Sequence, residues 1–92
     1  MNSSLFSLEN QIVLISGSSR GLGWSMAKAV SEAGATALLH GRNENLLKER
    51  MQQLQELGQN AEYYIFDVAN DEEVLAAFGK IQEQHGKLDG LI

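Results

Sequence analysis

A short apolar run that leads into a glycine-rich corner constrains this chain more than any other feature. Residues 12–15 read Ile-Val-Leu-Ile, and Gly17, Gly21 and Gly23 follow with the spacing G-x-x-x-G-x-G. A run without polar positions is typical of a strand that is covered on both faces of a parallel sheet. Glycine permits a positive φ angle and lets a ligand approach the backbone. With a helix after the corner, backbone N–H groups and the helix dipole converge at one point, which favours a phosphate group.

The three glycines take separate roles by analogy with the dinucleotide-binding fingerprint, although that fingerprint has the spacing G-x-G-x-x-G. In this analogy the first glycine makes the tight turn, the second lets a ligand approach closely, and the third brings the helix close to the sheet. The alternative is a tight turn between a strand and a helix that binds nothing. We favour a ligand because the sequence shows both a strand before the corner and a helix after it.

The rest of the chain alternates between expected strands and expected helices. Strands are expected at residues 12–15, 36–39, 63–66 and 87–92. Between them, apolar residues recur at helical spacing. They mark three buried helix faces: Leu22, Met26, Ala29, Val30 and Ala33; Leu46, Leu47, Met51, Leu54 and Leu57; and Val74, Ala77, Phe78 and Ile81.

Strands that alternate with helices predict right-handed crossovers and a parallel sheet. We expect an α/β fold, a Rossmann-like doubly wound sheet with about four strands in the order 3-2-1-4 and three helices. Asn43 and Asn70 are expected to cap the second and third helices, Asn70 with Glu73 in a variant of the capping box. Phe6 and Leu8 are expected to pack under the edge of the sheet.

The residues from Ser16 to Gly23 resemble the cofactor loop of the short-chain dehydrogenase/reductases, which usually reads T-G-x-x-x-G-x-G. Ser16 stands where that family more often has Thr, and it keeps the hydroxyl group. The resemblance implies that residues 1–92 form a partial NAD(P)-binding Rossmann domain. It also implies a cofactor-binding role for the loop residues Gly17, Ser19, Arg20, Gly21, Leu22 and Gly23.

Two arginines indicate which dinucleotide is bound. Arg20 lies inside the glycine loop, and Arg42 follows the second expected strand. Dinucleotide folds that bind NAD commonly place an acidic residue near the end of that strand. Here Gly41 and Arg42 take that place, and the next carboxylate after the strand is Glu44. A guanidinium group suits the 2′-phosphate of NADP through charge-assisted hydrogen bonds. The resemblance implies the same choice, since basic residues at these two places are marks of NADP in the family. The alternative is two solvated surface arginines; we expect NADP, with NAD less favoured.

The pair Asp67-Val68 resembles the family's Asp-Val pair after the third strand. The resemblance implies that the Asp67 carboxylate accepts from the adenine amino group and that the Val68 N–H meets the ring. The alternative is that Asp67 only caps a loop. His40 lies beside the expected pocket, but we interpret it as a strand-end residue rather than an acid or base. His40 and His85 have no partners at metal-ligand spacing, so no metal site is expected.

The catalytic residues of the family have no counterpart in this sequence. They are a Ser, a Tyr-x-x-x-Lys pair and often an Asn, whereas Tyr63 and Tyr64 are followed four residues later by Asp67 and Val68. Residues 88–92 resemble the strand before the family's Asn-Asn-Ala-Gly motif. We therefore expect the N-terminal portion of an NADP-dependent oxidoreductase, inactive by itself. The alternatives are a non-catalytic nucleotide-binding or regulatory module and a structural fragment that binds no nucleotide.

Composition limits the partners and the compartment. A net charge of −5 argues against nucleic acid or an anionic membrane surface as the main partner. The chain has no cysteine and no apolar run near the ~20 residues of a membrane span, so a reducing cytoplasm is expected. The expected partners are a nicotinamide dinucleotide and, in an intact parent enzyme, a small carbonyl or alcohol substrate.

The expected winding leaves part of the sheet uncovered. Two helices would lie on one face and the third would cross to the other, with the last strand at an edge. Exposed apolar sheet and a free strand edge favour pairing with another chain. We therefore expect a homo-oligomer, such as a dimer; the alternative is a monomer that is prone to aggregation.

Overall fold

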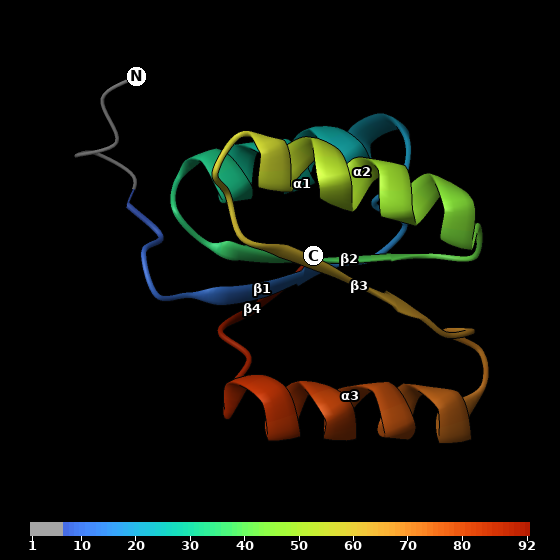
Figure 1. Cartoon of the computed structure of the whole chain (residues 1–92). Coiled ribbons are helices and arrows are strands. Elements are labelled where there is room, and N and C mark those ends of the chain that lie inside the picture. The colour runs from blue at the N-terminus through green and yellow to red at the C-terminus, as the bar shows by residue number, and fades with distance from the viewer. Residues whose placement is uncertain (1–6) are drawn as a thin grey trace.

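One parallel sheet organises residues 7–92, which are the residues that this computed structural model describes (Figure 1). Along the chain the elements are β1 (Ile12–Ile15), α1 (Gly21–Glu32), β2 (Thr36–Gly41), α2 (Glu44–Glu56), β3 (Ala61–Ile65), α3 (Asp71–His85) and β4 (Gly90–Leu91). All neighbouring strands are parallel, and the order across the sheet is β3-β2-β1-β4. The predicted α/β fold and strand order 3-2-1-4 are therefore confirmed.

Helices cover both faces of the sheet: α1 and α2 lie on one face, and α3 lies on the other (Figure 1). Alternate residues of β1 enter the two cores. Val13 and Ile15 pack in the core beneath α1 and α2, whereas Ile12 and Leu14 pack in the core beneath α3. All four are buried, which explains why the first strand has no polar position.

The buried face of α1 is offset from the predicted stripe. Leu22 is 78% exposed and Ala29 is also exposed. The buried residues of the helix are Ala27 and Ser31, which follow Gly23 at intervals of four. Small residues at this spacing let α1 lie close to the strands. The prediction holds in part, since Met26, Val30 and Ala33 are partly buried, and it was wrong for Leu22 and Ala29. It selected apolar side chains, whereas the most deeply buried positions carry small ones.

The predicted faces of α2 and α3 hold with one exception. Leu57 is 70% exposed because α2 ends at Glu56, which leaves Leu57 as the C-cap residue outside the packed turns. The remaining predicted positions are buried or partly buried: Leu46, Leu47, Met51 and Leu54 on α2, and Val74, Ala77, Phe78 and Ile81 on α3.

Strand boundaries shift by up to a few residues. β2 extends beyond the predicted 36–39, to Gly41, because its last two residues pair with β3. β3 begins before the predicted 63–66 and ends at Ile65. β4 is shorter than the predicted 87–92, since only Gly90 and Leu91 pair with β1.

Asn43 and Asn70 cap α2 and α3 as predicted. Asn43 Oδ1 accepts from the N–H of Leu46 and Asn70 Oδ1 from that of Glu73, each at 3.1 Å. The predicted capping box is not closed, because the Glu73 carboxylate accepts from the N–H of Asp67 at 3.0 Å. This hydrogen bond ties the start of α3 to the segment that follows β3.

The segment before β1 is anchored to the end of α1. Leu8 is partly buried against the core of that layer, and its N–H donates to the carbonyl of Ala33 at 2.9 Å. Phe6, which was expected to pack beside it, lies outside the described residues. Within residues 7–92, no helix is both long enough and apolar enough to cross a membrane.

Candidate functional site

The corner between β1 and α1 has a backbone shape that requires glycine. Gly17 and Gly21 have φ angles of +58° and +57°, in the left-handed region that side chains rarely adopt. A Cβ atom at Gly23 would lie 2.2 Å from the carbonyl oxygen of Gly17. Close packing at the third glycine is therefore observed, and its partner is the backbone of the corner rather than the sheet.

The N-terminus of α1 differs from those of the other two helices. Asn43 and Asn70 cap α2 and α3 with side-chain oxygens, and acidic residues occupy their first turns. Within residues 7–92, α1 starts after Arg20 with no capping side chain and no acidic residue in its first turn. A bound phosphate would supply both the missing acceptor oxygens and the negative charge.

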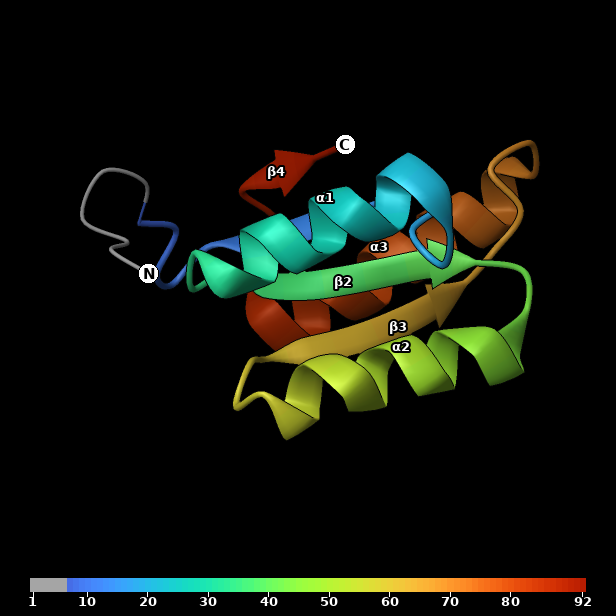
Figure 2. The same ribbon diagram turned by 90° about the horizontal axis from the view of Figure 1, so that it is seen from above.

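Buried Ser18 fastens the corner to the end of β2. Its N–H donates to the carbonyl of His40 at 2.8 Å, and its Oγ accepts from the N–H of His40 at 2.8 Å. The loop before α1 consequently lies beside the carboxyl end of β2 (Figure 2). Sequence analysis did not single out Ser18. The available signal was a serine in a glycine-rich turn, since serine hydroxyls often form hydrogen bonds with the backbone.

The His40 side chain bridges two segments that lie on either side of its own strand. Its Nδ1 accepts from the N–H of Gly17 at 3.1 Å, and its Nε2 lies 2.8 Å from the carbonyl oxygen of Phe66. A carbonyl only accepts, so the hydrogen-bond network assigns the proton to Nε2 and leaves Nδ1 as the acceptor of a neutral ring. His40 is a strand-end residue, as interpreted from the sequence, and it also joins the corner to the end of β3.

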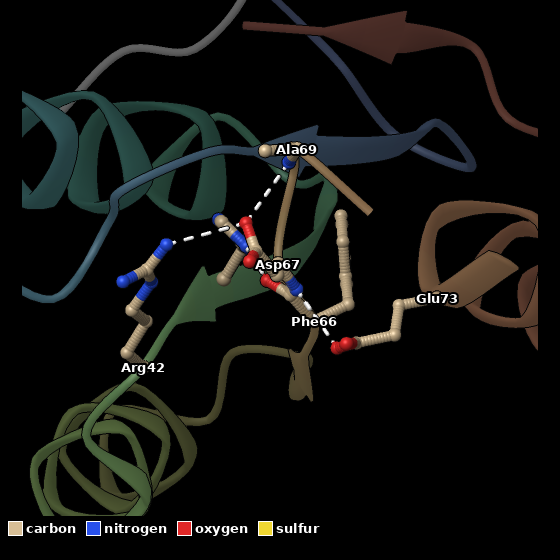
Figure 3. A network of polar contacts seen from close by, with 6 residues as sticks. Arg42, Phe66, Asp67, Ala69 and Glu73 are labelled. Atoms are coloured by element: carbon tan, nitrogen blue, oxygen red, sulfur yellow. Dashed lines mark hydrogen bonds and ion pairs between the residues drawn. The ribbon is translucent and has the colours of Figure 1, made fainter. Parts of the chain in front are cut away.

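Arg42 and Asp67, expected to bind different parts of a dinucleotide, lie within reach of each other (Figure 3). Arg42 Nη2 is 3.2 Å from Asp67 Oδ1, which also accepts from the N–H of Ala69 at 2.9 Å. The N–H of Asp67 donates to the Glu73 carboxylate. Three contacts therefore fix Asp67 immediately after β3.

Arg50 supports the corner from α2, a role that sequence analysis missed. Its Nε donates to the carbonyl of Ser19 at 2.9 Å, and its guanidinium carbon lies 4.7 Å from the centroid of the Trp24 ring. The signal in the sequence was its position three residues after Leu47, on the buried side of α2. Arg20, by contrast, is exposed and forms no ion pair with any residue from 7 to 92.

The structure gathers the expected site residues at one edge of the sheet. The corner follows β1, Arg42 follows β2 and Asp67 follows β3, and these strands are adjacent and parallel. Val68 is next in the chain and is 62% exposed. In open parallel sheets the carboxyl edge is where ligands bind.

Residues 11–92 match the sequence model of the short chain dehydrogenase family. The chain belongs to this family. Among relatives, it is 37% identical over 93 aligned positions to 2-dehydro-3-deoxy-D-gluconate 5-dehydrogenase from Formosa agariphila, an alignment that covers 100% of this chain and 35% of that protein.

Solved structures of two dehydrogenases share the fold. A gluconate 5-dehydrogenase from Burkholderia cenocepacia, in complex with NADP and tartrate, has a TM-score of 0.85 and 34% identity over 94% of this chain and 34% of that chain. A hydroxysteroid dehydrogenase from Escherichia coli has a TM-score of 0.90 and 25% identity over 99% of this chain and 38% of that chain. The short-chain dehydrogenase chain described here thus spans about a third of the length of these relatives.

The two tyrosines of this short-chain dehydrogenase chain both have a raised pKa. The hydroxyl of Tyr63 donates to the Glu44 carboxylate at 2.8 Å, and this hydrogen bond raises the pKa of Tyr63. Burial, and then the negative charge of Glu62, raise the pKa of Tyr64 to about 12. Proton transfer near neutral pH needs the opposite shift. Within residues 7–92, no three His, Asp or Glu side chains are grouped to hold a metal ion.

Proposed function

We propose that this chain is the cofactor-binding portion of an NADP-dependent oxidoreductase, which transfers a hydride between NADP and a small carbonyl or alcohol substrate. The observation that carries the proposal is the uncapped N-terminus of α1 at the carboxyl edge of the sheet, in a chain whose other two helices are capped. The glycine corner leaves that terminus accessible, since a Cβ at Gly21 would meet no atom within 4 Å. A dinucleotide pyrophosphate fits such a terminus.

The proposed site has three parts. The corner and the first turn of α1 would hold the pyrophosphate, the two arginines the 2′-phosphate, and the segment after β3 the adenine. The pyrophosphate part comprises Gly17, Ser19, Gly21, Leu22 and Gly23. The 2′-phosphate part comprises Arg20 and Arg42, and the adenine part comprises Asp67 and Val68. When bound, NADP supplies the hydride chemistry, while the residues of this chain bind and orient it.

The part that Gly17 plays is conformational. Its N–H already donates to His40 Nδ1, so its contribution to phosphate binding is the turn that its positive φ angle permits. The phosphate-binding amides are then those of Gly21, Leu22 and Gly23 in the first turn of α1.

Two observations favour NADP over NAD. β2 ends at Gly41 and Arg42 follows it, with a side chain that is 78% exposed at the edge where the ribose would lie. The next carboxylate, Glu44, accepts from the hydroxyl of Tyr63 and is thereby engaged elsewhere. A guanidinium group suits a 2′-phosphate, and the carboxylate that Arg42 contacts, Asp67, is itself 42% exposed.

The relatives support a shared cofactor rather than a shared substrate. The third of their length that matches this chain is common to dehydrogenases named for sugar acids and for steroids, and one of the solved structures contains NADP. The sequence has no Tyr-x-x-x-Lys. We therefore propose that the 92 residues bind cofactor and do not turn over substrate by themselves.

Calorimetric titration with NADPH and NADH tests this proposal. Arg42→Ala is expected to weaken NADPH by about 30-fold, since a hydrogen bond to a charged group contributes about 2 kcal/mol. NADH binding should change little, because NADH has no 2′-phosphate. Lys48→Ala, which removes an exposed cation from α2, is the control and should leave both ligands unchanged. Equal weakening of NADPH and NADH by Arg42→Ala would remove the NADP assignment.

We further propose that the chain associates with a second copy. An apolar groove of about 290 Å³ lies between the carboxyl end of β4 and α3. It is lined by Leu14, Ser16, Phe66, Val68, Val74, Phe78, Leu91 and Ile92. An exposed apolar groove beside an edge strand favours contact with another chain.

A further inference from the structure

His40 joins the two ends of the proposed cofactor site. It lies on β2, between β1 and β3, and is only 6% exposed. One ring nitrogen accepts from Gly17, at the phosphate end of the site. The other donates to the carbonyl of Phe66, the residue before Asp67, at the adenine end. A single imidazole therefore connects the segment proposed to bind the pyrophosphate to the segment proposed to bind the adenine.

We propose that His40 is a positioning residue for the cofactor: as a neutral ring with its proton on Nε2, it fixes the separation between the glycine corner and Asp67. This inference rests on the proposed NADP site. It concerns ligands that contact both ends at once, because only their binding depends on that separation. Ligands that contact one end should not need His40.

The side chain of His40 is not what holds the corner on the sheet. Ser18 does so through the backbone N–H and carbonyl of His40, at 2.8 Å each. β3 stays on β2 through the backbone ladder that pairs residues 37–41 with residues 61–65. These hydrogen bonds survive a substitution at position 40. What the ring adds is the link across β2, from the corner to Phe66.

Within residues 7–92, no other hydrogen bond joins the corner directly to Phe66 or Asp67. The Phe66 ring packs on the imidazole with centroids 4.3 Å apart, and Asp67 is fixed to Phe66 by the chain. Asp67 is held on its other sides by Arg42, Ala69 and Glu73, none of which touches the corner in residues 7–92. Loss of the imidazole bridge therefore leaves the two ends connected only through the backbone of β2 and β3, and the strands stay paired.

Three variants test the two hydrogen bonds of the His40 ring separately. In His40→Asn, the amide oxygen can replace Nδ1 as the acceptor for Gly17 but has no donor that reaches Phe66. In His40→Gln, the amide nitrogen can replace Nε2 as the donor to Phe66 and leaves Gly17 unpaired. His40→Phe fills the space and makes neither hydrogen bond. His85→Asn is the matched control, since His85 lies at the end of α3 and contacts Glu62.

Three ligands separate the two ends of the site. NADPH spans both, adenosine reaches only the adenine end, and inorganic pyrophosphate reaches only the corner. The three ligands are titrated into the full chain and binding is followed by NMR. His40→Asn and His40→Gln should each weaken the affinity for NADPH about fivefold, and His40→Phe about 25-fold. These values follow from the typical strength of one and of two hydrogen bonds. The two short ligands should keep their wild-type affinity within about twofold, and His85→Asn should change none of the three.

A second measurement needs no cofactor. Long-range ¹H–¹⁵N spectra of the free wild-type chain near neutral pH should show His40 with a protonated Nε2 and an unprotonated Nδ1. A proton on Nδ1, or equal loss of all three ligands in the Asn and Gln variants, would overturn the positioning role while leaving the NADP site intact. If the wild-type chain itself failed to bind NADPH, the proposed function would fail with it. Should His40→Phe not fold, the Asn and Gln pair still decides the matter.

Discussion

Arg42 and Asp67 form an ion pair, with Arg42 Nη2 3.2 Å from Asp67 Oδ1. The proposed site gives these residues to different parts of one ligand, the 2′-phosphate and the adenine. The side chains are 78% and 42% exposed, so the pair contributes little to stability. Its consequence is instead for binding, because Arg42 must share or leave Asp67 when it meets a phosphate.

The Asp67→Asn variant should therefore differ from Arg42→Ala in what it weakens. Adenine is common to both dinucleotides, so Asp67→Asn should weaken NADH and NADPH. The loss should be smaller for NADPH, because Arg42 no longer has to leave a carboxylate to meet the 2′-phosphate. The free energy of unfolding should change by about 0.5 kcal/mol or less, because an amide oxygen can still accept from Ala69. Titration with both ligands and urea unfolding measure the two quantities. A loss confined to NADPH would contradict the adenine role of Asp67.

Gly23→Ala should be strongly destabilising. The added Cβ would lie 2.2 Å from the carbonyl oxygen of Gly17, a backbone atom that cannot give way alone. Overpacking of this kind costs about 1–3 kcal/mol, measured as the shift in the urea midpoint. The matched control is Gly79→Ala in α3, where a Cβ meets no atom within 4 Å. Alanine there should stabilise the chain by about 0.5–1 kcal/mol through helix propensity, so the two substitutions should have opposite signs.

Arg50→Ala should loosen the corner from the side of α2. The change removes the hydrogen bond to the Ser19 carbonyl and the contact with the Trp24 ring. We expect a loss of about 1–2 kcal/mol in unfolding free energy and weaker NADPH binding. Trp24 is the single tryptophan of the chain, so its fluorescence reports the site directly. The control is Lys28→Ala, since Lys28 lies over the same ring at 5.4 Å but does not touch the corner; an equal effect of both variants would contradict the role of Arg50.

The fold could be predicted because its signals are local. An apolar run before a glycine corner, and helical periodicities between later strands, fix the element order, and the handedness of crossovers then fixes the sheet. Asn43 and Asn70 could be predicted as caps for the same reason, since each acts three residues away. The most buried positions of α1 were missed because Ala27 and Ser31 are selected by closeness to the strands, which hydrophobicity does not report.

The residues that hold the site in place, His40 and Arg50, could not be predicted in the same way. The partners of the His40 ring are 23 and 26 residues away in the chain, and the partner of Arg50 is 31 residues away. No periodicity reports such contacts, because they arise only when β1, β2 and β3 end at the same edge. The residues expected to touch the cofactor follow motifs, whereas the residues that hold them in place follow the packing.

Asp89 gives the chain an acid-sensitive contact at β4. Its carboxylate accepts from the N–H of Ile12 at 2.8 Å and lies 3.0 Å from Lys87 Nζ, and these partners lower the pKa of Asp89 below its ordinary 3.8. A lowered folded-state pKa stabilises the fold above the unfolded value, and this stabilisation is lost as the pH falls through the folded value. The difference in unfolding free energy between wild type and Asp89→Asn should thus be constant above about pH 5 and shrink in acid. A difference that stays constant down to about pH 2 in urea unfolding would contradict the assignment.

Self-association should depend on the apolar groove between β4 and α3. Leu91 lines it and is 62% exposed, so Leu91→Lys would place a charge where a second copy is proposed to bind. Burying an unpaired charge is costly, and the dimer dissociation constant should rise by about tenfold or more. Sedimentation velocity over a range of concentrations measures it. Leu57→Lys is the control, because Leu57 is 70% exposed at the end of α2 and does not line the groove. A wild-type chain that stays monomeric at all concentrations, or equal effects of the two lysines, would show that this groove does not bind another copy.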